Sequence, residues 1–296
     1  MSSLSPDGHC EITQNNQLLA QCSLWWRNTP PYLNEKLGYI GQYGANSREA
    51  SHALLHQACQ KLASQGCTMA IAPINGNTWN SYRFITYRGS EPPFFLEPDN
   101  PDEWVADILS FGFSPFAEYY SALTTDLTQL DPRLNRVRQR LQHQGVQIRT
   151  FNLDSWEAEL ANLYHLCCIS FRSNFLYTPI SQAEFIAQYQ PILPYLKPEF
   201  IFIAECQQQT VGFLFAIPDY LQTAKDTLII KTVAILPSRQ YAGLGNVLVA
   251  DCQTQAASLG YRRAIHALMH AANPSRNLSA RYAQTMRRYS LFAKPL

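Results

Sequence analysis

Short runs in which apolar and polar positions alternate fill the first 125 residues, interrupted by two stretches of helical spacing. Strict alternation indicates a half-buried strand, whereas an apolar residue every three or four positions indicates an amphipathic helix. Asn15–Asn16 separates two of the runs and predicts a hairpin turn, since asparagine tolerates the left-handed conformation that tight turns need. The pattern predicts strands at 10–14, 18–26, 38–45, 67–74 and 118–124, and helices at 49–66 and 103–113.

The second half continues the same alternation of strand and helix patterns. Ser181, followed three residues later by Glu184, has the spacing of a capping box and predicts a helix start. Residues 126–145 are basic on one side and predict a helix after Pro132, which we interpret as a linker or a bridging helix. This division predicts domains at 1–125 and 146–296. The predicted strands are 146–153, 199–206, 210–217, 228–236 and 262–269, and the predicted helices are 155–171, 181–193, 246–259 and about 276–287.

A weak internal repeat relates the two halves. Leu54 to Gly66 and Leu248 to Gly260 have the same spacing, and each lies in a strand–turn–helix–glycine–strand order. When the two segments are superposed, the first half has Glu and Ser at the positions of Gly243 and Gly245. The repeat therefore predicts that the halves share an architecture and that only the second keeps its glycines.

Composition narrows the class of protein. Hydrophobic residues make up 46% and charged residues 15% of the 296 residues, and the net charge is +1. This charge balance favours neither nucleic acid nor an anionic membrane as a partner. The first residues are polar and no apolar run reaches the roughly 20 residues of a membrane span, so we expect a soluble, cytoplasmic protein. The eight cysteines form no C-x-x-C pair, which favours free thiols and predicts no metal site.

The segment between the strand at 228–236 and the following helix contains Arg239, Gln240, Gly243 and Gly245. A helix N-terminus leaves N–H groups free and carries a partial positive charge, so it can hold a phosphate that side chains do not block. The two glycines would remove the Cβ atoms where a pyrophosphate approaches, and the arginine and glutamine would add donors. The alternative is an ordinary turn that uses glycine only for its shape.

Gln240-Tyr241-Ala242-Gly243-Leu244-Gly245 resembles the cofactor loop of the GNAT (GCN5-related N-acetyltransferase) superfamily. The resemblance covers roughly 146–289, and the first half resembles a degenerate copy. It implies an α/β protein with two such domains, each a mixed, mostly antiparallel sheet flanked by helices, and acetyl-CoA as co-substrate. The cofactor contacts that it implies are Val233 and Ile235, by their main chain, and Arg239, Gln240, Tyr241, Ala242, Gly243, Leu244, Gly245, Asn246 and Asn273.

Acetyl transfer to an amine needs a proton acceptor, a stabilised carbonyl oxygen and a leaving thiolate. The loop-bearing strand has Lys231 where the family often has a carboxylate. This lysine could act as a base if burial lowered its pKa. It could also bind an acidic substrate group, or be a solvated side chain. His266 is a second candidate, since His266 and His270 lie four apart and would share one strand face; it could equally be a core histidine. Tyr282 is the positional match for the family's acid, although a packing role is the alternative.

Two polar and aromatic segments are candidates for binding the acceptor. Residues 73–83 contain Trp79 and Arg83, which could line a cleft between the domains or simply belong to a turn. Arg172, Asn174 and Tyr177 occupy the segment where the family holds its substrate, so they are candidates by resemblance.

The resemblance implies transfer of an acetyl group to an amine of a small molecule or peptide by direct attack, with no nucleic acid or membrane as partner. Two alternatives stay open. One is a non-catalytic sensor that binds acyl-CoA without turnover. The other is a tandem aminoacyl transferase of cell-wall peptide assembly, which would need a basic face for transfer RNA and is disfavoured by the net charge of +1. The oligomeric state is not readable from the sequence.

Overall fold

A mixed sheet runs through the computed structural model, which describes residues 5–129, 131–272 and 283–296. The described strands follow the order β1-β2-β3-β4-β12-β6-β11-β10-β9-β8-β7, with β5 paired to β12. The strands are β1 (Gly8–Gln14), β2 (Gln17–Trp25), β3 (Leu37–Ala45), β4 (Met69–Ala72), β5 (Phe84–Tyr87), β6 (Ser114–Thr124), β7 (Val146–Thr150), β8 (Ile201–Cys206), β9 (Gln209–Pro218), β10 (Thr227–Ile235), β11 (Arg263–His270) and β12 (Gln284–Pro295).

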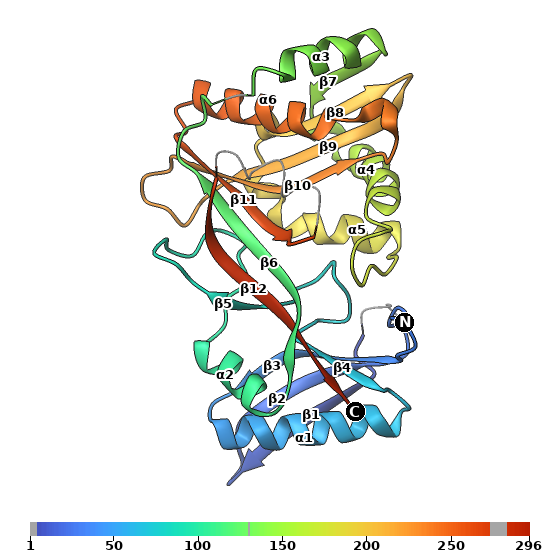
Figure 1. Cartoon of the computed structure of the whole chain (residues 1–296), viewed down its shortest axis with the longest axis vertical. Helices are drawn as coiled ribbons and strands as arrows, with labels where there is room; N and C mark the ends of the chain where they lie inside the picture. Colours follow the sequence, from blue (N-terminus) through green and yellow to red (C-terminus); the bar gives the residue numbers. More distant parts are fainter. Residues whose placement is uncertain (1–4, 130, 273–282) are drawn as a thin grey trace.

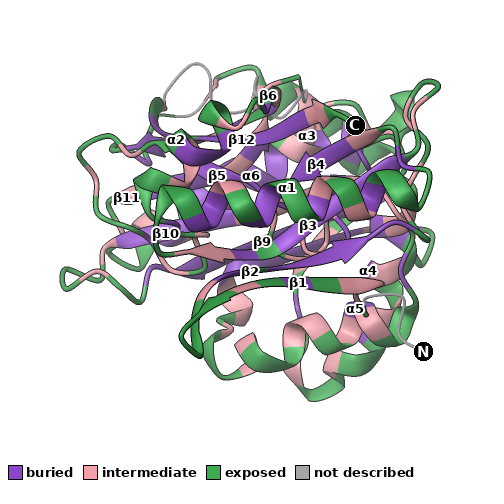
Figure 2. Ribbon diagram, turned by 90° about the horizontal axis from the view of Figure 1, so that it is seen from below, coloured by how far each residue is buried: buried purple, intermediate pink, exposed green. Residues whose placement is uncertain are grey.

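Helices cover both faces of this sheet. On the strands of the second half, α3 and α6 pack over one apolar cluster, and α4 and α5 over another on the opposite face. In the first half α1 packs on the sheet with its buried residues on one side and its exposed residues on the other (Figure 2). The helices are α1 (Arg48–Ser64), α2 (Asp102–Ser110), α3 (Leu134–His143), α4 (Trp156–Ser170), α5 (Gln182–Tyr189) and α6 (Leu244–Ser258).

Local signals in the sequence place most of these elements correctly. Asn15 and Asn16 join β1 to β2 with φ of 50° and 63°, the left-handed pair expected of the hairpin turn. Ser181 and Glu184 form the predicted capping box at the start of α5. The helix predicted at about 276–287 is wrong for residues 284–287, because these belong to β12, which pairs with β6 along its length. Residues 276–282 of that prediction lie outside the described part.

The last strand of the chain joins the first half of the sheet. β12 lies between β4 and β6, antiparallel to both, while β6 pairs on its other side with β11. Figure 1 shows β6 and β12 as long central strands that connect the upper and lower groups of elements. Each half therefore completes its sheet with a strand from the other, so the sheet runs across the predicted division at 125–146.

The internal repeat is confirmed in the topology. β3 pairs parallel with β4 across α1, and β10 pairs parallel with β11 across α6. Gly66 and Gly260 follow the two helices with φ of 77° and 87°, the left-handed conformation that favours glycine at a helix end. Both halves thus contain one parallel β–α–β unit within an otherwise mainly antiparallel sheet.

Candidate active site

The parallel strands β10 and β11 separate halfway along β10. Their pairing runs from Thr227 with Arg263 to Ile230 with His266 and stops there. β10 continues to Ile235 paired with β9, with a register shift between Ile230 and Thr232. Lys231 therefore lies at the bulge where the two strands separate.

Beyond this point, the main-chain groups of β10 that face away from β9 pair with no strand in the described part of the chain. The N–H of Ile235 donates to the hydroxyl of Ser170 at the end of α4, with N and Oγ 3.2 Å apart. Because main-chain groups alternate between the two sides of a strand, the N–H and C=O of Val233 face the same side. Val233 and Ile235 thus present their main chain where the strands separate. Their contact with a cofactor, which the resemblance implies, stays a prediction.

The glycine turn, residues 238–245, follows directly and leads into α6. The helix begins at Leu244, two residues earlier than predicted, and Gly243 precedes it with φ of 83°. No side chain caps this helix among the described residues, so the N–H groups of its first turn point outward without a partner. Arg239 and Gln240 are exposed beside it.

The surroundings of the two glycines differ from the predicted ones. A Cβ on Gly243 would lie 2.9 Å from Cγ1 of Val137 on α3, and its φ disfavours any other residue. A Cβ on Gly245 would make ordinary contacts of 3.5 Å with Val233 and 3.7 Å with Ile235. Both Cβ positions therefore point at protein atoms rather than outward, so Gly243 allows α3 to approach and Gly245 is sterically replaceable.

α3, the predicted linker helix, is fixed to this turn. The Arg140 guanidinium donates to the carbonyl of Ala242. Two residues earlier, Arg138 forms a two-point ion pair with Asp251 of α6, with Nη1 and Oδ2 3.0 Å apart. The segment between the halves thus packs against the glycine turn instead of acting as a free connector.

The corresponding unit of the first half is closed. Past the β3–β4 pairing, the N–H of Ile74 donates to the carbonyl of Ile40 at 2.9 Å, and the Asn75 side chain accepts from the N–H of Gln42 at 2.6 Å. The hydroxyl of Ser47 caps α1, accepting from the N–H of Ala50 at 3.2 Å. This unit therefore has neither separated strands nor an uncapped helix start.

A cluster of charged and aromatic side chains lies beside Lys231. Arg83, from the first half, places its guanidinium 3.7 Å from the ring centroid of Tyr82 and 4.1 Å from that of Tyr119 on β6. The His270 ring lies 4.9 Å from the Tyr119 ring. The charge of Arg83 acts on both Lys231 and His270. We call Tyr82, Arg83, Tyr119, Lys231 and His270 the junction cluster.

Comparison with known proteins agrees with this geometry. Residues 160–282 match the model of the Acetyltransferase (GNAT) family. Similar solved structures include a GCN5-related N-acetyltransferase from Sphaerobacter thermophilus (13% identity, TM-score 0.54, covering 95% of this chain and 78% of that one). They also include a tandem GNAT protein from the clavulanic acid biosynthesis pathway (11%, 0.51, covering 99% and 85%) and a GCN5-related N-acetyltransferase from Anabaena variabilis (8%, 0.54, covering 99% and 64%). The search among curated proteins found no match.

The second half of the chain carries a GNAT domain. The protein is therefore an acyltransferase of the N-acetyltransferase type. At these identities the solved structures show the fold alone, and their coverage extends the GNAT architecture over both halves. None of the helices that the structure describes is long and apolar enough to cross a membrane.

Lys231 has the electrostatics of a weakened base in this GNAT domain. Burial, followed by the charge of Arg83, lowers the pKa of Lys231 to about 8, while Glu97 opposes the shift. Its ammonium group lies 3.1 Å from the carbonyl oxygen of Leu96. Burial, with Arg83 again second, also lowers the pKa of His270. Lys231 is therefore partly neutral near pH 8, and the neutral form of His270 is favoured.

His266 and His270 lie on different faces of β11, so the prediction that they share one face is wrong. An extra residue in β11 between His266 and Met269, with Leu268 at φ 59°, reverses the alternation of side chains. His266 faces α6, is 4% exposed, and lies 3.4 Å from the Gln253 amide nitrogen. Burial lowers its pKa to about 4, so it stays neutral in the core while His270 joins the junction cluster.

The acceptor candidates from the sequence are only partly brought together. Arg83 is in the junction cluster, whereas the Trp79 indole donates to the carbonyl of Thr178 at 2.8 Å and packs against Tyr177. This contact joins residues 73–83 to the segment after α4. Arg172 and Asn174 are exposed on that segment, and it reaches the junction cluster through Phe175, which contacts His270. Tyr282 and Asn273 lie outside the described residues.

Sequence reasoning missed a buried polar network next to the junction cluster. Glu97 accepts from Nε of Arg287 at 2.8 Å and from the hydroxyl of Tyr289 at 2.5 Å. Tyr289 also contacts the hydroxyl of Ser121, which accepts from the N–H of Leu268. An isolated glutamate in the Pro-rich loop at 92–101 gives no sequence signal for this, because its partners are about 190 residues away.

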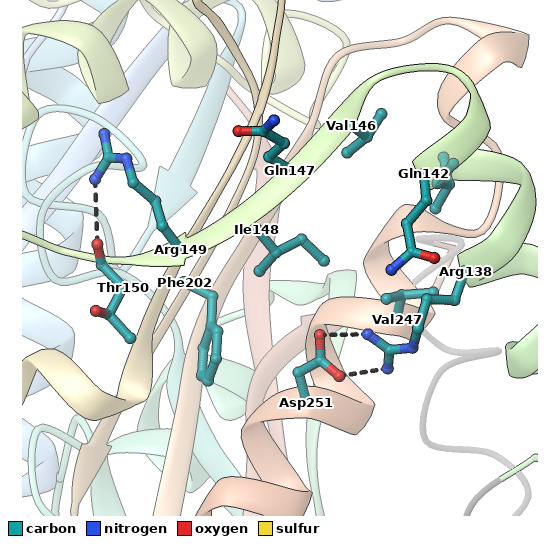
Figure 3. A pocket seen from close by; sticks show the side chains of 11 residues that line it. Arg138, Gln142, Val146, Gln147, Ile148, Arg149, Thr150, Phe202, Val247 and Asp251 are labelled. Carbon is teal, nitrogen blue, oxygen red and sulfur yellow. Dashed lines mark hydrogen bonds and ion pairs between the residues drawn. The ribbon is translucent and has the colours of Figure 1, made fainter.

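A cavity of about 550 Å³ lies elsewhere in the GNAT domain, beside the edge strand β7. Figure 3 shows the Arg138–Asp251 ion pair in its wall. Its other walls come from β7, β8 and the side of α6, and none of the predicted site residues that the structure describes lines it. The cavity is thus separate from the junction cluster and the glycine turn.

Proposed function

We propose that the protein transfers an acetyl group from acetyl-CoA to an amine of a small molecule or peptide. The observation that carries this proposal is the separation of β10 from β11 directly before the uncapped start of α6. An extended, amide-containing arm such as pantetheine can pair with unpaired main-chain groups as an added strand does. The free N–H groups of a helix N-terminus bind a pyrophosphate.

The parts of the cofactor are assigned along this path. The pyrophosphate lies at the N–H groups from Gly243 to Asn246, with Arg239 and Gln240 at the rim. The pantetheine arm lies along the main chain of Val233 and Ile235, which directs the thioester toward Lys231 and the bulge. The closed unit of the first half offers no such path, which supports a single cofactor site.

The reaction is direct attack by the acceptor amine on the thioester carbonyl carbon. A C–N bond forms, the C–S bond breaks, and the CoA sulfur leaves as a thiolate that takes up a proton. Lys231, neutral, accepts the proton that the amine loses, directly or through water. Tyr282 stays the candidate for protonating the thiolate by its position in the sequence.

The proposal is tested by thermal unfolding with and without acetyl-CoA. Ligand at about 100 times its dissociation constant adds about 2.7 kcal/mol, which is roughly 5–10 °C in Tm for a chain of this size. Asn246→Glu adds a negative charge to the first turn of α6; it favours the helix itself but repels the pyrophosphate. We expect it to abolish the shift without lowering the Tm of the free protein.

Thr254→Glu is the matched control, since Thr254 is exposed on the same helix far from its start. It should keep the shift. No shift in the folded wild type would contradict the proposal. A shift without release of CoA, across a panel of amines, would instead favour the non-catalytic sensor.

A further inference from the structure

Arg83 is a nearly buried cation whose contacts are neutral groups. The residue is only 7% exposed. Nε donates to the carbonyl of Tyr82 at 3.2 Å and Nη1 to that of Leu268 at 3.1 Å, and the guanidinium stacks on two tyrosine rings. Ring faces compensate part of a buried charge. Nη2 donates to no group among the described residues.

No carboxylate of the chain pairs with Arg83. The structure describes all 22 Asp and Glu residues, and none forms an ion pair with this guanidinium. Arg287, the other buried arginine of the described residues, shows the contrast, because it is 2% exposed and binds Glu97. Glu97 is fully engaged by Arg287, Tyr289 and the N–H of Phe94. A buried charge without a counter-ion is costly unless a ligand supplies one.

Two further basic side chains lie near Arg83. Lys231 and His270 both lie close enough for Arg83 to disfavour their protonated forms. Both are partly exposed, whereas Arg83 and Tyr119 are buried. An anion bound to Arg83 would offset the effect of its charge on both side chains.

The anion does not belong to the cofactor in the proposed arrangement. The cofactor's phosphates lie at the glycine turn, after Ile235, and its thioester end reaches Lys231. The anion next to Lys231 and Arg83 is therefore on the acceptor. A guanidinium fork matches the two oxygens of a carboxylate. We propose that the acceptor is an amine that also carries a carboxylate, such as a free amino acid, and that Arg83 binds this carboxylate.

This inference rests on the proposed acetyl transfer, and its test compares matched acceptors on the intact chain. Pools of the twenty amino acids and of their carboxamides are offered with acetyl-CoA, and CoA release and acetylated products are measured. The α-amine of a carboxamide is less basic than that of the acid, so more of it is neutral near pH 7. Intrinsic reactivity therefore favours the amides, which is opposite to the preference that we expect. We expect at least tenfold higher kcat/KM for the acids, mainly through KM.

Arg83→Gln should reduce this preference to less than threefold and leave the Tm shift by acetyl-CoA unchanged. Arg88→Gln is the control, since Arg88 forms ion pairs with Asp99 and Asp102 at the surface; it should keep the preference. If Arg83→Gln does not fold, the comparison of acids with amides on the wild type still decides.

Equal use of acids and amides would overturn the inference while acetyl transfer itself stands. A preference for phosphoethanolamine over the acids would overturn the carboxylate assignment. If neither pool is acetylated, the Tm of the acetyl-CoA complex is measured with each pool. A higher Tm with the acids than with the amides supports Arg83 as the carboxylate site. Equal Tm values overturn the inference. Failure of acetyl-CoA itself to bind would count against the proposed function.

Discussion

The candidate base of this site is Lys231, whereas the family often has a carboxylate on the same strand. Its pKa of about 8 results first from burial and then from the charge of Arg83. A lysine with an ordinary pKa near 10.4 would be protonated at neutral pH and could not accept a proton. In the free protein Arg83 lowers the proton affinity of Lys231, and in the proposed mechanism it also binds the acceptor.

The first prediction concerns the pH profile. Because Lys231 acts when neutral, kcat/KM should rise with pH through about 8 and then level off. Lys231→Met should remove this step and lower kcat/KM by about 10²–10⁴. Arg83→Gln removes a neighbouring positive charge, so the inflection should move to higher pH. An inflection that stays in place in Arg83→Gln would assign it to the acceptor's own amine and not to Lys231.

At the scale of elements, the start of α6 depends on how closely α3 approaches it. Gly243 has φ of 83° and leaves room for Val137 of α3, while Gly245 has neither constraint. Arg138 and Arg140 hold α3 in this position through Asp251 and the carbonyl of Ala242. The glycine turn is thus shaped jointly by the GNAT domain and by the helix that precedes it.

The second prediction compares alanine at the two glycines by urea unfolding. Gly243→Ala should destabilise the protein by about 1–3 kcal/mol for its left-handed backbone, with a further cost from the contact with Val137. Gly245→Ala should be neutral or stabilise by up to about 1 kcal/mol, because alanine favours a helix. Adding Val137→Ala to Gly243→Ala should recover only the part of the lost stability that comes from the contact with Val137. Equal effects at both glycines would show that the packing of α3 is unimportant.

At the scale of the whole molecule, the halves are joined through an exchange of strands. β6 from the first half fills the space between β11 and β12, and β12 from the second half pairs with β4 and β5. The junction cluster is built at this exchange, with Arg83 from one half and Lys231 and His270 from the other. The first half is therefore required for the site even though its own β–α–β unit is closed.

The third prediction is that the halves do not fold separately. Residues 126–296 expressed alone should lack a cooperative unfolding transition, because the absence of β6 exposes the buried edges and faces of β11 and β12. Co-expression with residues 1–125 should restore a stable complex that acetyl-CoA stabilises. Circular dichroism and size-exclusion chromatography measure both. A fragment 126–296 that unfolds cooperatively on its own would support the division into independent domains at 125–146.

The sequence by itself determined the local elements, the repeat and the glycine turn. Periodicity, the capping box at Ser181 and Glu184, and the asparagine turn act over a few residues, so they can be read without the fold. The tertiary structure decided β12, whose residues 284–287 resembled a helix end but pair with β6, over 160 residues earlier. It also decided that a bulge turns His266 into the core, that Glu97 neutralises Arg287, and that Arg83 does not meet a carboxylate. These outcomes depend on pairings and charges brought together from distant segments, which no local pattern encodes.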